Sequence, residues 1–429
     1  MTTRRDFLRQ TTGALLLTGL ETGRCAGVAA PEPDKLSTIR RLKNPVAIAM
    51  WDFSWLLRQH PGGGFEDYDR ALDGLAERGY NAVRIDVFPH LVGLAGREGV
   101  PERFTFAGRG GGRHALWGND VDVTVDPRAA LLEFIPKCRK RGIHVEASTW
   151  FMGPKGTSDR IRSFEDFVAV WSETLDFMER NDLLRDVLFV DLLNEYPQWN
   201  GFAWLREAAQ EAAEAQEPDG PKKKGDEHIQ DNKRRPVTDA QRAFYRQFST
   251  RLIRHFRGQR PRYDFAISLS PNWDGFQNER SVDVNAMDVL DLHIWFGHRA
   301  PISQYDMAKA QEMNPEELRQ RYGLLKKAWT DHRTVLIQWM DERLALHARW
   351  GRAANAVVGN TEGWGSVGWA DMAPLDWEFI KETAGVCVDL ALKHGQRFVC
   401  TSNFTHPHFK RLWADVAWHK AITAKIRNA

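Results

Sequence analysis

Residues 190–197 (VDLLNEYP) are a run of apolar residues that ends at a carboxylate, Glu195. A second stretch, residues 356–364 (AVVGNTEGW), ends in the same way at Glu362. Uninterrupted apolar runs are typical of strands that are buried on both faces of a parallel sheet. A parallel α/β barrel carries its functional residues at the C-terminal ends of such strands. The two stretches therefore predict a barrel with Glu195 and Glu362 at one site.

The rest of the chain supplies the repeated units that a barrel needs. Strand-like runs occur at residues 46–53, 82–88, 143–149, 187–194, 265–270, 289–295, 356–361 and 397–402. Helical patterns lie between them, among others at residues 67–78, 127–141, 164–180, 238–257 and 377–394. Gly79, Gly142 and Gly395 each stand where a helix C-cap glycine is expected. Eight alternations of strand and helix predict an α/β fold of the (β/α)8 TIM-barrel type.

The stretch 334–339 (TVLIQW) resembles a ninth strand. When the sequence is followed to residue 350, however, apolar positions recur at helical spacing and no turn signal interrupts them. These positions are Leu336, Met340, Leu344, His347 and Trp350. We therefore predict a helix, which leaves Glu342 outside the site.

Two insertions interrupt the repeat. Residues 89–126 form a long Gly-rich loop after the second strand and are expected to build a wall or lid of the active-site face. The stretch GRGGGR at 108–113 is not a phosphate-binding loop, because it does not join a strand to a helix. Residues 215–236 are charged and poor in apolar side chains, which predicts a flexible surface insertion after strand four.

The N-terminus is not expected to belong to the fold. Residues 3–9 (TRRDFLR) and the apolar stretch 14–20 resemble a twin-arginine export signal, here assigned to residues 1–30. The apolar stretch is much shorter than the roughly 20 residues that a membrane-spanning helix needs. Lipidation at Cys25 is an alternative, but Gly23-Arg24 before it matches that motif poorly. We expect export to the periplasm or beyond, and a catalytic domain over residues 31–429.

Composition narrows the possible partners. The formal net charge is +2, and the four Arg, one Asp and one Glu of residues 1–30 account for all of it. A neutral remainder gives no electrostatic reason to expect nucleic acid or an anionic membrane as a partner. The cysteines beyond residue 30, Cys138, Cys387 and Cys400, have no metal-ligand spacing and are expected to be buried thiols, although a disulfide between two of them stays open. We expect no metal, no organic cofactor and a monomer.

Several motifs carry a resemblance to a known superfamily over nearly all of residues 44–429. They are Asn194-Glu195 ending strand four, Thr361-Glu362 ending strand seven, the stretch 79–84 (GYNAVR) entering strand two, and His293-Ile-Trp295 ending strand six. The chain thereby resembles the clan A retaining glycoside hydrolases, in particular their cellulase-like branch. The resemblance implies that Glu195 is the acid/base and Glu362 the nucleophile, acting on a carbohydrate.

The chemistry of these residue types agrees with that implication. Retaining hydrolysis uses two carboxyls about 5–5.5 Å apart, one protonated and one ionised. Arg84 is a candidate cation to keep Glu362 ionised, and the Asn194 amide could bind a sugar 2-hydroxyl. The structural alternatives are that the glutamates cap helices, that Arg84 pairs with Asp86 or Asp52, and that His293 is a satisfied core histidine.

Tryptophan placement points to carbohydrate independently. The chain has 17 tryptophans. Those at or just beyond predicted C-terminal strand ends are Trp150, Trp199, Trp273, Trp295 and Trp364, and we add Trp51 and Asp52 at the end of strand one as candidate substrate contacts. Indole faces stack well on the apolar C–H faces of pyranose rings. The alternative is that these side chains fill the upper rim of the barrel.

The sequence departs from the clan pattern at two strands. Trp295 replaces the tyrosine that would hydrogen-bond the nucleophile, and residues 402–404 (SNF) replace the tryptophan that usually ends strand eight. We expect a retaining β-glycoside hydrolase acting on a poly- or oligosaccharide. A catalytically silent carbohydrate-binding barrel is the first alternative. An exported redox enzyme is the second, opposed by the lack of a Cys cluster, dinucleotide fingerprint or haem motif.

Overall fold

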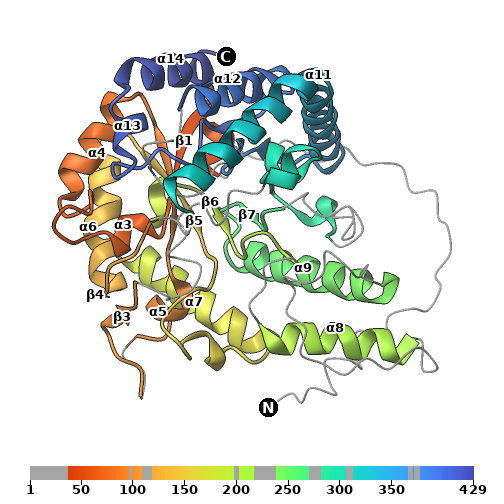
Figure 1. Cartoon of the computed structure of the whole chain (residues 1–429). Helices are drawn as coiled ribbons and strands as arrows, with labels where there is room; N and C mark the ends of the chain where they lie inside the picture. Colours follow the sequence, from red (N-terminus) through yellow and green to blue (C-terminus); the bar gives the residue numbers. More distant parts are fainter. Residues whose placement is uncertain are drawn as a thin grey trace.

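The computed structural model describes residues 37–95, 99–108, 118–197, 202–216, 238–269, 282–305, 313–365, 371 and 377–429. Its centre is a curled sheet of six parallel strands in the order β10-β1-β2-β5-β6-β7 (Figure 1). These strands are β1 (Val46–Asp52), β2 (Ala82–Asp86), β5 (His144–Ser148), β6 (Val187–Asp191), β7 (Phe265–Ala266) and β10 (Phe398–Cys400). Helices lie along the outside of the sheet.

A second parallel pair, β8 (Val289–Asp291) and β9 (Val357–Gly359), lies between the two edges of the six-stranded sheet. A bridge between Leu269 and Leu292 connects β7 to β8, and a bridge between Asn360 and Val399 connects β9 to β10. Backbone hydrogen bonds of 2.8–2.9 Å accompany both bridges. Each of the eight predicted strand-like runs therefore contains one of these parallel strands.

The larger helices follow the predicted pattern. They are α4 (Tyr68–Glu77), α6 (Pro127–Lys140), α7 (Phe164–Arg180), α8 (Ala203–Gln216), α9 (Asp239–Gln259), α11 (Pro315–Ala354), α12 (Trp377–Lys393) and α14 (Val416–Arg427). Side chains at their N-termini explain several starts: Asp67 accepts from two backbone N–H groups of α4, and Ser163 accepts from one of α7. Shorter helices are α2 (Thr38–Arg41), α3 (Ser54–Leu57), α5 (Pro89–Val92) and α13 (Lys410–Trp413).

The stretch that resembled a ninth strand is helical, as predicted. Residues 334–350 lie within α11, whose backbone departs from helical geometry at His332. Leu336, Met340 and Leu344 are buried, whereas Glu342 is exposed. The apolar face of the helix therefore packs inward and keeps Glu342 away from the site.

The loop after the second predicted strand has secondary structure of its own, which we did not predict. It contains α5 and an antiparallel pair, β3 (Phe104–Phe106) and β4 (Val123–Val125). Phe104 and Phe106 are buried in the main hydrophobic core, so this part of the insertion packs as an integral wall. Most of the charged insertion at 215–236, and the whole presumed signal at 1–30, lie outside the described residues.

The inner face of the strands changes character along their length. A separate apolar cluster contains Ala82, Phe189, Ala266 and Val289, together with Ile39 of α2. Side chains two residues further along a strand point to the same face. Those positions are Arg84, Asp191, Ser268 and Asp291, all fully buried. The interior is thus apolar at the N-terminal ends of the strands and polar toward their C-terminal ends, where the site lies.

The three cysteines in the described part of the chain are free and buried, as expected. Among the described helices, we find none with both the length and the apolar character needed to cross a lipid bilayer.

Candidate active site

The two glutamates follow β6 and β9 directly and lie in a nearly enclosed site. The backbone N–H of Glu195 donates to Ser268 Oγ at 2.9 Å, and its φ of 46° lies in the left-handed region. A non-glycine residue rarely adopts that conformation, and such residues concentrate at functional sites. The exposed fractions of Glu195 and Glu362 are 4% and 3%.

The side chains of Glu195 and Glu362 converge on His293. An oxygen of each carboxylate and a ring nitrogen of His293 all lie within 4.8 Å of one another. His293 Nδ1 lies 3.1 Å from Glu195 Oε1 and 3.5 Å from Glu362 Oε2. His293 therefore sits against both carboxylates, from the end of β8.

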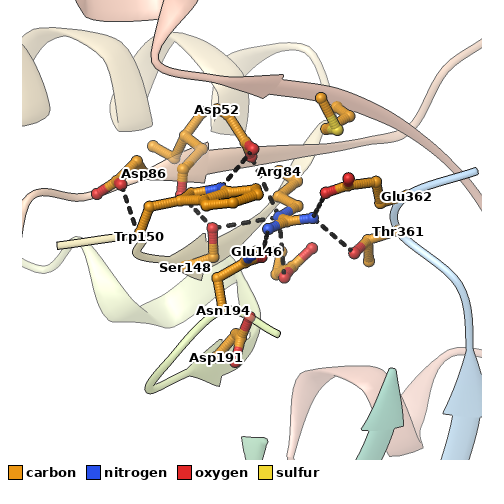
Figure 2. Close-up of polar contacts among 12 residues, drawn as sticks. Asp52, Arg84, Asp86, Glu146, Ser148, Trp150, Asp191, Asn194, Thr361 and Glu362 are labelled. Atoms are coloured by element: carbon orange, nitrogen blue, oxygen red, sulfur yellow. Dashed lines mark hydrogen bonds and ion pairs between the residues drawn. The ribbon is translucent and has the colours of Figure 1, made fainter. Parts of the chain in front are cut away.

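Arg84 on β2 connects the site across several strands (Figure 2). Its Nη1 donates to Glu362 Oε2 at 3.0 Å, and its Nε lies 3.1 Å from Asp52 Oδ1. Its Nη2 donates to Asn194 Oδ1 in a short hydrogen bond. Arg84 is fully buried, so each of these contacts is made away from water. The guanidinium thus fixes both Glu362 and the residue that precedes Glu195.

The carboxyl group of Glu146 lies beside Arg84 on the neighbouring strand, β5. The β2–β5 register pairs Arg84 with Glu146, whose Oε1 is 3.7 Å from Arg84 Nε. Neither carboxyl oxygen of Glu146 has a hydrogen-bond partner. Burial raises the pKa of Glu146 well above its usual range, against the attraction of Arg84. Burial therefore favours the protonated form of this side chain.

The protonation of Glu362 differs from the expectation that Arg84 alone would keep it ionised. Burial, with a further contribution from Glu195, raises the pKa of Glu362 to about 8. His293 and Arg84 act in the opposite direction but do not outweigh burial. Burial therefore favours the protonated form of Glu362 near neutral pH.

Asp291 determines the state of His293. Burial alone would lower the pKa of His293, but the carboxylates of Asp291 and Glu362 outweigh it and raise that pKa well above its usual value. Asp291 lies two residues before His293 on β8, and its Oδ2 is 3.3 Å from His293 Nε2. The imidazole is therefore a cation that faces Asp291 on one side and the two glutamates on the other.

Two of the predicted aromatic contacts lie near this cluster. The Trp150 indole N–H donates to Asp52 Oδ2 at 2.8 Å, and its backbone N–H donates to Asp86 Oδ2 at 2.9 Å (Figure 2). Trp295 lies two residues beyond His293, and both indoles are 8% exposed. Asp52 and Trp150 thus form one unit anchored to Arg84.

Two other predicted aromatic contacts belong to the hydrophobic core, which corrects our expectation. Trp51 is fully buried, its indole N–H donates to the Thr405 carbonyl, and its ring packs edge-on against Phe65. Trp364 is 1% exposed and donates to the Cys400 carbonyl. Neighbouring side chains occupy the ring faces that a sugar would need. Trp199 and Trp273 lie outside the described residues.

Sequence reasoning missed four buried polar residues that contact the site. They are Glu146, Ser148, Asp291 and Thr361. The sequence does contain a pattern that points to three of them. Glu146 and Ser148 stand two and four residues after His144, and Asp291 stands two residues before His293. Polar residues at steps of two in an otherwise apolar strand share one face.

Glu195, His293 and Glu362 are also the residues that could hold a metal ion in the described part of the chain. The guanidinium of Arg84, 3.0 Å from Glu362, opposes a second positive charge at that position. The geometry favours a carboxylate pair held by an arginine and a histidine, an arrangement suited to proton transfer and nucleophilic attack.

Comparisons with known proteins place the chain in a family. Among solved structures, a Parabacteroides distasonis protein named a "putative glycoside hydrolase" is 26% identical, with a TM-score of 0.68 over 90% of this chain and 94% of that one. An exo-β-1,4-mannosidase from an Opitutaceae bacterium is 12% identical, with a TM-score of 0.48 over 92% of this chain and 63% of that one. An endo-1,4-β-D-mannanase from Thermotoga petrophila is 12% identical, with a TM-score of 0.44 over 83% and 87%.

No curated protein sequence matches the chain significantly. The profile of one family, described as sugar-binding cellulase-like, matches residues 48–427. That span includes every strand of the parallel sheets except the first two residues of β1, and both glutamates of the site. The chain belongs to the sugar-binding cellulase-like family.

Proposed function

We propose that the protein is a retaining β-glycoside hydrolase that cleaves glycosidic bonds in a poly- or oligosaccharide. The observation that carries the proposal is the pair Glu195 and Glu362, whose oxygens approach within 4.8 Å beside Arg84 and His293. Retaining enzymes hold their two carboxyls about 5–5.5 Å apart, whereas inverting enzymes need about 6.5–9.5 Å to admit a water molecule. The spacing favours retention.

In the proposed first step, Glu362 attacks the anomeric carbon and the bond to the leaving oxygen breaks. Glu195 gives its proton to that oxygen, and a covalent glycosyl-enzyme forms. In the second step, Glu195 takes a proton from water, whose oxygen attacks the anomeric carbon and releases Glu362. Glu195 must be protonated and Glu362 ionised at the start of this cycle.

This cycle requires Glu362 to give up, when a sugar binds, the proton that its raised pKa favours. Arg84 and His293 contact Glu362 at 3.0 and 3.5 Å and supply the charge that an ionised Glu362 needs. Asn194 supports sugar binding, because its Nδ2 is buried with no hydrogen-bond partner among the described residues while its Oδ1 accepts from Arg84. That amide could donate to a 2-hydroxyl.

We also infer that the eight strands close into one (β/α)8 barrel. The bridges at Leu269–Leu292 and Asn360–Val399 supply the two links that closure needs. Export by the twin-arginine route and a monomeric state are further proposals that rest on the sequence.

Chemical rescue tests the function. Glu362→Ala should abolish hydrolysis of aryl glycosides, and azide should restore activity and give a glycosyl azide of inverted configuration, because the small anion enters the vacated space. Glu195→Ala should spare substrates with good leaving groups in the first step, and its azide product should retain configuration. Glu342→Gln, an exposed glutamate of α11, is the control and should behave as wild type.

A catalytically silent sugar-binding barrel is the second candidate. The observation in its favour is Trp295, which stands where the clan pattern has a tyrosine that bonds the nucleophile. If wild-type protein binds oligosaccharides but hydrolyses none of a broad panel, and the three variants do not differ from it, this candidate replaces the enzyme.

A further inference from the structure

Asp291, the last residue of β8, is a buried carboxylate that connects two strand ends of the site. Its Oδ1 accepts from the backbone N–H of Thr361 at 2.9 Å, and its Oδ2 accepts from the Thr361 hydroxyl. The same Oδ2 lies 3.3 Å from His293 Nε2. Asp291 therefore ties His293 on β8 to the residue that immediately precedes Glu362.

This arrangement fixes which way the imidazole points. Nε2 is turned toward Asp291 Oδ2 and the Thr361 hydroxyl, at 3.3 and 3.1 Å, and also lies 3.2 Å from Arg84 Nη1. Nδ1 faces Glu195 and Glu362. A charged imidazole donates from both nitrogens. One donor can then satisfy Asp291 while the other serves the carboxylate pair.

The donor matters because the nearby aromatic residue lacks a hydroxyl. Trp295 occupies the position of the clan tyrosine, and an indole offers a single N–H from a rigid bicyclic ring. His293 is a described side chain with a ring N–H within 3.5 Å of Glu362 Oε2. Arg84 Nη1 donates to the same oxygen at 3.0 Å, and His293 adds a second donor, which also faces Glu195.

We propose that Asp291 is a positioning residue that holds His293 as the hydrogen-bond donor to Glu195 and Glu362, in place of a tyrosine. The inference rests on the proposed function for its meaning in catalysis. Asp291 acts through His293 and touches no substrate, so its removal should affect turnover rather than substrate binding.

Charged groups face His293 from all the strands around it. They are Asp291 on β8, Arg84 on β2, Glu195 after β6, Glu362 after β9, and at longer range Asp52, Glu146 and Asp191. Of the groups that raise the pKa of His293, Asp291 contributes most. An amide at this position keeps the size of the side chain and removes that contribution.

The test is Asp291→Asn, measured as full pH profiles of kcat and kcat/KM on an aryl glycoside. We expect kcat to fall by about 10- to 100-fold, the usual effect of losing a partner that orients a functional group, with KM nearly unchanged. The alkaline limb of the kcat profile should move to lower pH, because His293 loses its proton more easily without the Asp291 carboxylate. NMR titration of the histidine Cε1–H resonances, assigned with His293→Asn, should show the same shift without any activity measurement.

Two variants separate this role from a structural one. Asp191→Asn removes a carboxylate of equal burial that bonds Ser268 and Leu193 but not His293, and it should shift the titration of His293 much less than Asp291→Asn does. If Asp291→Asn does not fold, Thr361→Val removes the hydroxyl that contacts both Asp291 and His293 and should shift the titration in the same direction.

The outcomes distinguish the two proposals. If wild type hydrolyses glycosides but Asp291→Asn keeps its kcat, its pH profile and its histidine titration, the positioning role is wrong and the enzyme stands. If wild type hydrolyses nothing but the titration shifts, Asp291 still holds His293 and the enzymatic proposal fails.

Discussion

Arg84 Nη1 lies 3.0 Å from Glu362 Oε2, and both side chains are enclosed by the strands that carry them. The same guanidinium contacts Asp52 and Asn194, so one cation holds groups from β1, β6 and β9. A lysine has a single ammonium group and cannot reproduce this planar set of donors. The geometry of the site thus depends on this arginine.

Arg84→Met should therefore damage both stability and activity. Removing one partner of a buried ion pair leaves uncompensated carboxylates, which typically costs about 3–5 kcal/mol. We expect that loss in urea unfolding, together with loss of detectable hydrolysis, while Arg84→Lys should recover part of the stability but little activity. Arg333 of α11 is a half-exposed side chain that pairs with Glu382 of α12. Arg333→Met should therefore change neither stability nor activity appreciably. Wild-type activity in Arg84→Met would contradict the role given to this residue.

The buried acids predict that stability falls with rising pH above neutrality. Burial raises the pKa of Glu362 to about 8 and that of Asp86 to about 7, and the carboxylates around His293 raise its pKa above the usual 6.5. The folded protein then retains protons that the unfolded chain has already released, so stability is lost as pH rises through these values. Histidines whose pKa burial lowers act in the opposite direction near pH 6.5, because their imidazoles are half charged in the unfolded chain at that pH. This effect fades above about pH 7.5. These histidines include His90, His347, His406 and His419.

Urea unfolding at several pH values from about 7.5 to 8.5, where unfolded histidines are mostly neutral, measures this effect. Each proton that only the folded state retains contributes at most about 1.4 kcal/mol per pH unit. Glu362→Gln mimics the protonated carboxyl and should flatten the decline. A wild-type stability that rises over this range would show that the acids ionise normally in the folded protein.

The sequence carried enough information for the strands because each is an apolar run bounded by turn residues. It also gave the residues at the strand ends, since one face of each strand must reach the same edge of the sheet. The environment of the buried charged groups could not be predicted in this way. The raised pKa of Glu146 and the contact between Asp291 and His293 both depend on which side chains from distant strands meet. Trp51 shows the same limit, because its position at a strand end looks identical in sequence to that of Trp150, although its ring packs on Phe65.

Export makes a prediction that is independent of the site. Residues 1–30 lie outside the described residues, so the twin-arginine signal stays a prediction from Arg4 and Arg5. Because such a motif is read by a receptor, changing both to lysine keeps the charge but should stop export. The double variant should accumulate in the cytoplasm of a bacterial host that has the twin-arginine system, while Arg9→Lys should export normally. Normal export of the double variant would refute this assignment.

Trp150 and Trp51 allow a binding role to be separated from a packing role. Trp150 lies beside the site and donates to Asp52, which in turn pairs with Arg84. Trp150→Phe removes that donor and part of the ring surface, and should raise KM for oligosaccharides several-fold with a small change in melting temperature. Trp51→Phe leaves the Thr405 carbonyl without its donor and a gap in the core, so it should lower the melting temperature with little change in KM. Steady-state kinetics and thermal unfolding of the two variants measure these effects. If Trp51→Phe raises KM more than Trp150→Phe does, our assignment of the two rings is wrong.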